Sequence, residues 1–375
     1  MSTQFRNVLK FLVFVGLGFG ILYLLYRNQQ AAYAAECAAK GIAADDCSLL
    51  DKVIADFRGA NFGWLLLTIG AYCVSNLSRA LRWNQLLQPF GHRPRLVNSF
   101  LALNLGYFAN LGFPRLGEIA GPAALAKYED IKLERVMGTV VVGRIIDVIS
   151  ILLLSALALW LASDQLLGWL GENVDLSRFA GLEWLVSGVV TVGVVVLALA
   201  WFQRDRITGT KVGGRAVGIL KGFVEGLQSI LKLDRPVVFI FHSINIWLMY
   251  FLMTLFTTYA FAPTADIGSE GALVTFVAGG WGIVIPSPGG MGTYHFLAQS
   301  ALGLYGVPGE DGFSWANISF FTIQIGANVL IGLLALLLLP RINRHYSPLP
   351  DAPAAAPAAS GDHLGKPSPE PTPLE

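Results

Sequence analysis

The sequence predicts an all-α fold: a polytopic membrane helical bundle with six full spans and two oppositely oriented re-entrant hairpins. Of its 375 residues, 54% are hydrophobic and only 14% are charged, whereas a soluble globular chain carries about 25% charged residues. Six apolar segments also reach the length of about 20 residues that a membrane-spanning helix needs. These segments are residues 8–26, 62–81, 136–162, 184–202, 237–261 and 318–339.

The positions of Lys and Arg predict which loops are cytoplasmic. The loop after the second span carries Arg79, Arg82, Arg93 and Arg95 without an acid, and residues 203–236 hold seven basic residues against three acidic ones. The other loops are richer in acids. We therefore expect both termini to lie in the cytoplasm. Residues 31–35 also resemble a signal-peptide cleavage site, so removal of the first segment remains an alternative.

Two apolar segments are interrupted by Gly, Pro and polar residues, at 104–118 and at 280–295. The charge count requires residues 96–135 to enter and leave on the cytoplasmic side, and residues 271–316 to enter and leave on the outside. Backbone freed from a helix cannot face lipid, because each unpaired N–H or C=O costs several kcal/mol there. The two segments are thus expected to line a cavity. Their mirrored placement predicts an inverted repeat, with halves of about 62–202 and 237–340.

Three further parts complete the expected domain organisation. Residues 1–346 form the integral membrane domain. Within it, residues 215–233 form an amphipathic linker helix, which is expected to lie on the cytoplasmic membrane surface. Residues 347–375 are rich in Pro and Ala and are expected to form a disordered cytoplasmic tail.

Arg144 and Asp147 are charged residues three positions apart in a predicted span, so they lie on one face of a helix. Each charge at the bilayer centre costs about 2.5 to 3.5 kcal/mol on insertion scales. One interpretation is an ion pair that lines the site, with Arg144 free to meet an anionic headgroup. The other is a buried structural pair that stabilises helix packing.

The first broken segment supplies more candidates. After Pro114, a new half-helix would begin with free N–H groups and a positive dipole end, both suited to an anion. Arg115 could then bind phosphate bidentately, and Glu118 could pair with Arg144, take up a proton or contact a cationic headgroup. Alternatively, Arg115 and Glu118 are interfacial charges. The substrate-binding candidates of this segment are Asn110, Pro114, Arg115, Gly117 and Glu118.

The second broken segment offers an extended turn followed by a histidine. Glycine lets backbone approach a ligand closely, and His295 could carry protons, although a single histidine is more often a structural donor. The GGxG pattern is not a dinucleotide fingerprint, because no strand precedes it. The candidates of this segment are Pro286, Pro288, Gly289, Gly290, Gly292 and His295.

The remaining candidates are two arginines and two cysteines. Arg79 and Arg82 either extend to cytoplasmic headgroups or guide a lipid headgroup toward the first hairpin. Cys37 and Cys47 share the first external loop and could form a disulfide. No metal-ligand spacing occurs, so neither a metal nor a cofactor is expected. The net charge of +1, without a basic run, gives no reason to expect nucleic acid as a partner.

Four blocks of sequence resemble one family. SNLSRALRW, NLGYFANLGFPRLGEIAG, GTVVVGRIIDVI and IPSPGGMGTYHF, in this order and spacing, are similar to the lysylphosphatidylglycerol synthase transmembrane family, also called flippase-like. The resemblance covers about residues 8–339. It implies a membrane region that translocates aminoacylated phosphatidylglycerol from the inner to the outer leaflet. In that family a separate soluble domain attaches the amino acid, and no such domain is recognised in this sequence.

The resemblance reaches individual residues. Pro114, Arg115, Gly117 and Glu118 match the family's proline and glycine–glutamate block. The arginine–aspartate pair matches Arg144 and Asp147, and the glycine block matches Pro288, Gly289, Gly290 and Gly292. Two positions differ: Gly121 stands where the family often has a basic residue, and Gly143 where it often has an acid. One charge of each sign is missing, which bears on the headgroup that would bind.

The expected function is translocation of an anionic or modified phospholipid, or of a lipid-linked headgroup, between the leaflets of the bacterial inner membrane. The expected partners are membrane lipids and a lipid-modifying synthase, and no enzymatic activity is expected. One alternative is an integral-membrane enzyme or accessory factor for lipid-linked sugars, in which Glu118, Asp147 and His295 supply acid or base chemistry. Another is a scaffold that recruits a lipid synthase.

Overall fold

The computed structural model describes residues 20, 22–35, 37–39, 41, 43, 47–112, 115–165, 168, 233–285 and 290–346. Every regular element within these ranges is a helix, which confirms the predicted all-α class. The predicted span 184–202, the tail 347–375, and most of segments 8–26 and 215–233 lie outside the described residues.

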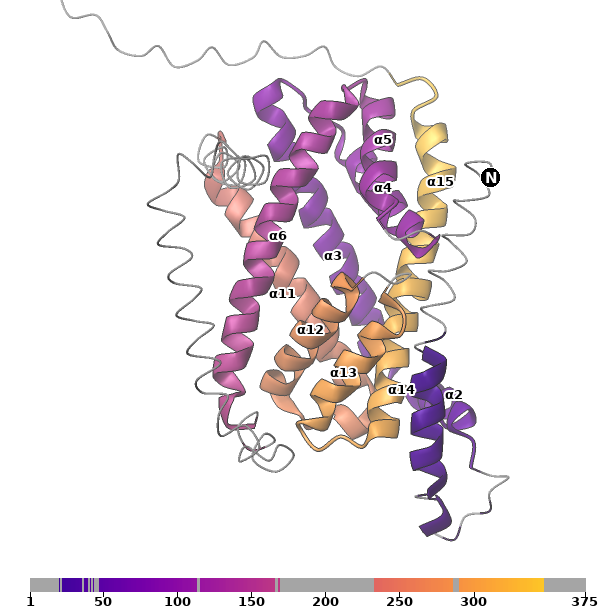
Figure 1. Cartoon of the computed structure of the whole chain (residues 1–375). Helices are drawn as coiled ribbons and strands as arrows, with labels where there is room; N and C mark the ends of the chain where they lie inside the picture. The colour runs from indigo at the N-terminus through magenta and orange to yellow at the C-terminus, as the bar shows by residue number, and fades with distance from the viewer. Residues whose placement is uncertain are drawn as a thin grey trace, which may run out of the picture.

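Long helices form the body of the bundle. They are α3 (Phe62–Leu87), α6 (Leu133–Leu161), α11 (Pro236–Ala260) and a continuous helix made of α14 (Gly309–Phe320), the π-helical η6 (Phe321–Val329) and α15 (Leu330–Ile342). The last of these has 34 residues, and it, α6 and α11 are each long and apolar enough to cross a membrane. Three of the six predicted spans are thus supported by length and composition. α3 packs along α11 (Figure 1).

The first predicted hairpin consists of α4 (Leu96–Gly112) and α5 (Gly117–Glu129). With 17 and 13 residues, these helices are about 25 and 20 Å long, shorter than a hydrocarbon core of about 30 Å. Glycine allows their backbones to touch: a Cβ added at Gly106 would lie 2.9 Å from the carbonyl oxygen of Gly117. The pair therefore enters the bundle and turns back as one tightly packed unit.

The second hairpin consists of α12 (Gly268–Val284) and α13 (Thr293–Gly303). Between them, Gly290 and Gly292 adopt left-handed conformations with φ of 82° and 83°, which glycine reaches without steric cost. In Figure 1 the α4–α5 hairpin lies in the upper half of the bundle and the α12–α13 hairpin in the lower half. This arrangement agrees with the predicted opposite orientation, whereas the inverted repeat itself stays a prediction.

The two ends of the bundle differ in charge. At the end where α4 begins and α5 stops, the exposed acids are Asp130, Glu134 and Asp234, whereas the exposed bases are Arg93, Arg95, Lys127, Lys132, Arg135, Arg235, Arg341 and Arg344. At the opposite end, α2, α14 and the region where α12 begins carry the acids Asp51, Asp56, Asp266, Glu270, Glu310 and Asp311 against the bases Lys52 and Arg58. This asymmetry is the pattern from which membrane orientation is read.

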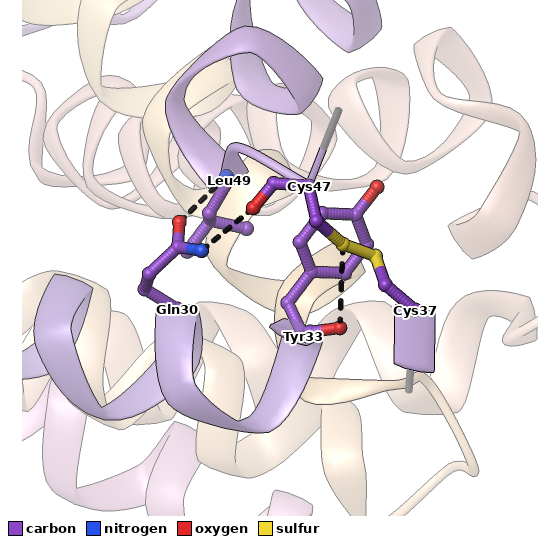
Figure 2. Close-up of a disulfide and its surroundings, with 5 residues drawn as sticks. All are labelled: Gln30, Tyr33, Cys37, Cys47 and Leu49. Atoms are coloured by element: carbon purple, nitrogen blue, oxygen red, sulfur yellow. Dashed lines mark hydrogen bonds between the residues drawn. A yellow bond between two sulfur atoms is a disulfide. The ribbon is translucent and has the colours of Figure 1, made fainter. Parts of the chain in front are cut away.

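The residues that precede α3 carry a disulfide and pack against the bundle at its acidic end. Cys37 and Cys47 form a disulfide with their Cα atoms 6.3 Å apart, and Gln30 donates to the Cys47 carbonyl at 2.8 Å and accepts from the Leu49 amide at 2.7 Å (Figure 2). α2 (Leu49–Gly59) follows directly. Lys52 of this helix binds Asp311 of α14 at 2.6 Å. The Lys52–Asp311 ion pair attaches this N-terminal segment to the bundle.

Candidate functional site

A cavity opens between α3, α4, α5 and α6, beside the first hairpin. It measures about 80 Å³, far below the volume of about 300 Å³ or more that encloses a drug-sized ligand. It therefore admits only a small polar group and not a complete lipid. Its polar side chains are Arg79, Arg82, Tyr107, Asn110, Glu118, Thr139, Arg144 and Asp147, and its apolar ones include Trp83, Leu86, Leu103, Pro122 and Val140.

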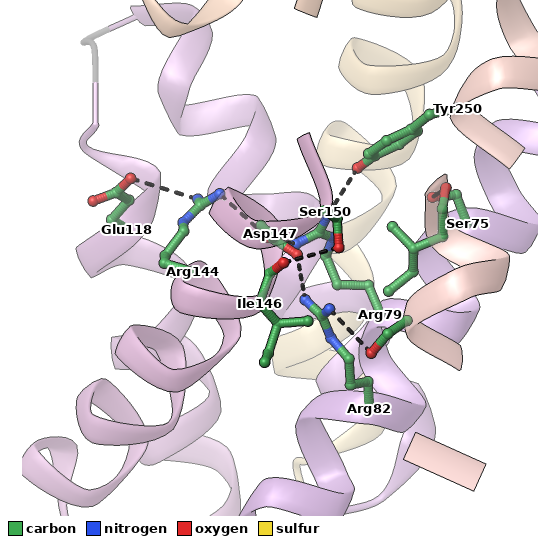
Figure 3. A network of polar contacts seen from close by, with 11 residues as sticks. Ser75, Arg79, Arg82, Glu118, Arg144, Ile146, Asp147, Ser150 and Tyr250 are labelled. Carbon is green, nitrogen blue, oxygen red and sulfur yellow. Dashed lines mark hydrogen bonds and ion pairs between the residues drawn. The ribbon is translucent and has the colours of Figure 1, made fainter. Parts of the chain in front are cut away.

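Asp147 of α6 is the centre of the charged network in this cavity. Its Oδ2 accepts a hydrogen bond from Arg79 Nη1 at 2.6 Å, and its Oδ1 accepts one from Arg82 Nη2 at 2.8 Å (Figure 3). The two arginines lie three residues apart on α3, so both point to the same side of that helix. Arg79 also donates to the hydroxyl of Tyr250 on α11 at 3.2 Å. The network thus joins three long helices.

Arg144 is only a distant partner of Asp147. Its Nη1 lies 3.8 Å from Asp147 Oδ2, while its Nη2 lies 3.5 Å from Glu118 Oε1. The side chains of Arg144 and Glu118 are 48% and 41% exposed, against 12% for Asp147. The spacing of Arg144 and Asp147 on one helix predicted that they form a pair. In the structure, Arg79 and Arg82 of α3 lie closer to Asp147 than Arg144 does. The expected pairing of Glu118 with Arg144 is present.

Arg79 and Arg82 point into the bundle. Their side chains are 12% and 3% exposed, so they do not extend to a headgroup region as the sequence suggested. Together with Arg144, they place three guanidinium groups against the carboxylates of Glu118 and Asp147. The described lining therefore carries one surplus positive charge, which favours an anionic ligand.

The start of α5 differs from the expected anion site. The amide of Gly117 donates to Asn110 Oδ1 at 2.7 Å, and the amide of Glu118 donates to the Arg115 carbonyl at 3.2 Å. These groups are thus not free to bind an anion, and side chains must do so instead. Arg115 is exposed, has a left-handed φ of 66° and is not part of the described cavity lining. Pro114 lies outside the described residues.

The two glycines that differ from the family pattern have different structural roles. A Cβ at Gly121 would lie 2.9 Å from the carbonyl oxygen of Ala102, so close packing of α4 on α5 explains why a larger residue is absent. A Cβ at Gly143 would meet Arg82 Nη2 at 3.7 Å, an ordinary contact. An acid at position 143 would therefore fit beside Arg82. Its absence leaves the surplus positive charge uncompensated.

The second hairpin does not contribute to this cavity within the described residues. His295 is 1% exposed, its Nδ1 accepts from the Gly292 amide at 3.4 Å, and its ring lies 4.9 Å from that of Phe320. These contacts are those of a histidine buried in the packing of the second hairpin. Gly290 and Gly292 shape the turn, while Pro286, Pro288 and Gly289 lie outside the described residues. The candidates of the two hairpins are thus not brought together here.

Several side chains of the candidate site escaped the sequence analysis. Tyr107 lines the cavity and precedes Asn110 by three residues, so helical spacing could have identified it. Tyr250 lies in the apolar run of α11 and gives no such signal. Trp83 Nε1 donates to Thr139 Oγ1 at 2.9 Å across the cavity wall, a contact that needs the packing of α3 on α6.

The comparisons with known proteins identify the family of this chain. No curated protein and no solved structure matches the chain significantly. A family model described as the lysylphosphatidylglycerol synthase TM region matches residues 48–332, a range that contains every residue of the cavity. The chain therefore belongs to the lysylphosphatidylglycerol synthase transmembrane-region family, whose membership indicates a membrane protein of lipid metabolism or translocation.

Proposed function

We propose that this protein is a lipid translocase of the bacterial inner membrane, which moves an anionic or modified phospholipid, or a lipid-linked headgroup, between the leaflets. The observation that carries the proposal is the buried contact of Asp147 with Arg79 and Arg82, beside a small cavity within the helical bundle. Charged residues inside a membrane domain are costly to bury, and they commonly mark the pathway of a polar substrate.

The proposed transport cycle uses the cavity for the headgroup alone. Asp147 fixes Arg79 and Arg82, which supply a positive field, and half-exposed Arg144 binds the phosphate bidentately. Asn110 and Tyr107 are available at the same wall. Because the cavity is small, the acyl or prenyl chains stay in the bilayer. Movement of one half of the bundle against the other would then expose the headgroup to the second leaflet.

The translocase is favoured over an enzyme acting on lipid-linked sugars. Both oxygens of Asp147 already accept hydrogen bonds from arginine, so this carboxylate is poorly placed to act as a base. His295 is buried in the second hairpin. We accordingly propose membrane lipids as the substrate, no covalent chemistry, and a lipid-modifying synthase as a partner that supplies the lipid.

Reconstitution tests the function directly. Liposomes that contain the purified protein and a headgroup-labelled anionic phospholipid should show transfer of the label between leaflets, with the mass of the lipid unchanged. Arg144→Gln should abolish the transfer. Arg58→Gln, at an exposed position on α2, is the matched control. A change in lipid mass would instead indicate an enzyme, and no change in either quantity would favour the scaffold.

A further inference from the structure

The Glu118–Arg144 ion pair lies on an apolar, exposed surface. Arg144 follows Leu133, the first residue of α6, by about 17 Å along a helix about 43 Å long, so it is far from either end. Val141 and Val148, at helical spacing from Arg144, are exposed, as are Leu116 and Ile119 beside Glu118. Two half-exposed charges therefore lie among these apolar side chains, with the exposed Arg115 next to Leu116.

Such a pair is unlike a purely structural one. A charge at membrane depth that faces hydrocarbon costs several kcal/mol, so charged side chains face the bundle interior, water or a polar passenger. Asp147 obeys this rule by burial between two arginines. Glu118 and Arg144 line the same cavity, but nearly half of each side chain is exposed, so neither is enclosed as Asp147 is.

We propose that the slit between α5 and α6, closed by the Glu118–Arg144 ion pair, is a lateral portal through which the phosphate group of an anionic phospholipid enters the cavity. The acyl chains remain outside on the apolar rim formed by Leu116, Ile119, Val141 and Val148. This inference rests on the proposed function, and it identifies where the lipid enters.

The other boundaries of the cavity are more strongly joined. α4 and α5 touch through backbone at Gly106 and Gly117, and α3 is joined to α6 by the two short bonds to Asp147. The Glu118–Arg144 contact, at 3.5 Å, is longer than the two bonds to Asp147. It is the weakest of these polar contacts, so the α5–α6 boundary is the one that we expect to open.

The far end of α5 is anchored, so opening is a tilt in which α5 moves together with α4. Glu129, the last residue of α5, is 6% exposed. Its Oε1 accepts from the Arg95 amide at 3.0 Å and from Asn98 Nδ2 at 2.6 Å, and its Oε2 accepts from the Tyr346 hydroxyl at 3.0 Å. These bonds join α5 to the start of α4 and to the end of α15. On opening, Arg144 exchanges the carboxylate of Glu118 for the lipid phosphate.

Fluorescence quenching tests the portal. In a Cys73→Ser background, a fluorophore is attached at Ile119→Cys on the rim or at Leu333→Cys on the exposed face of α15. The proteins are placed in phosphatidylcholine vesicles that contain anionic N-acylated phosphatidylethanolamine with a nitroxide on its headgroup, or phosphatidylcholine with a nitroxide in mid-chain. Position 119 should lose fluorescence with the headgroup nitroxide, and Arg144→Gln should remove this loss. Position 333 should respond to the mid-chain nitroxide only.

The outcomes separate the portal from the function. Quenching at position 119 by the mid-chain nitroxide alone, or by neither, would overturn the portal even if reconstituted protein moves lipid between leaflets. Headgroup quenching at position 119 without any transfer would support the portal as a binding site and overturn translocation.

Discussion

Asp147 and Arg144, three residues apart, are expected to respond differently to substitution. Asp147→Asn removes the carboxylate from two buried guanidinium groups, and loss of one partner of a buried ion pair costs about 3–5 kcal/mol. Arg144→Gln breaks a longer contact between two half-exposed side chains, so its cost should be smaller. Thermal unfolding in detergent should therefore show a large loss of stability for the first variant alone, and lipid transfer should be lost in the second. Equal destabilisation would contradict separate structural and binding roles.

Spacing along the chain identified some of these partners and missed others. It predicted that Arg144 and Asp147 share a helix face, and it allowed Glu118 to pair with Arg144, which the structure shows. It could not pair Asp147 with Arg79 and Arg82, because that contact depends on how α3 packs against α6. Residues on one helix can be related by periodicity, whereas contacts between helices depend on tertiary packing.

Gly121 and Gly143 form a matched pair for testing the packing of the first hairpin. Alanine at position 121 would bring a Cβ to 2.9 Å from a backbone carbonyl, and such overpacking costs about 1–3 kcal/mol. Alanine at position 143 meets nothing closer than 3.7 Å and gains up to about 1 kcal/mol of helix propensity. The midpoint temperature of thermal unfolding should fall for Gly121→Ala, and it should stay equal or rise for Gly143→Ala. A neutral Gly121→Ala would mean that α4 and α5 can separate.

At the scale of elements, the predicted breaks are present but narrower than the sequence suggested. α4 continues to Gly112 and α12 to Val284, although both predicted segments begin earlier, at residues 104 and 280. Asn104 explains the difference in the first hairpin. Its side-chain Nδ2 donates to the Phe100 carbonyl at 2.8 Å, and its Oδ1 accepts from Asn76 Nδ2 of α3 at 2.8 Å. A polar residue whose bonds are satisfied inside the bundle does not end a helix.

The contribution of Lys52 to the attachment of α2 to α14 should be lost in the alkaline range. Burial lowers the pKa of Lys52, but Asp311 and Asp56 raise it by more, so this pKa lies above its ordinary value of 10.5. A group with a raised pKa in the folded state stabilises fully below the unfolded pKa and loses that contribution as pH rises through the folded one. The difference in unfolding temperature between wild type and Lys52→Met should thus be constant near neutral pH and shrink above about pH 10.5. A difference that already shrinks as pH rises from 7 to 9 would contradict this assignment.

On the scale of the whole molecule, charge counting and helix breaks together predicted the arrangement of the hairpins. Loop charges required each broken segment to return to its own side, and the structure places the α4–α5 and α12–α13 pairs in opposite halves of the bundle (Figure 1). The same reasoning expected both hairpins to enclose one site. The described cavity instead belongs to α3–α6 alone, because side-chain packing between the halves cannot be inferred from topology.

The orientation in the membrane is the remaining whole-molecule prediction. Two independent features point the same way: the exposed bases gather at the end where α4 begins, as expected of a cytoplasmic face, and the Cys37–Cys47 disulfide lies at the opposite end, where an oxidising compartment would preserve it. In a Cys73→Ser background, a membrane-impermeant maleimide should label Asp266→Cys in intact spheroplasts and Arg344→Cys only after permeabilisation. The reverse pattern would place the disulfide in a reducing compartment and would make the outer leaflet the side from which a lipid enters beside α5.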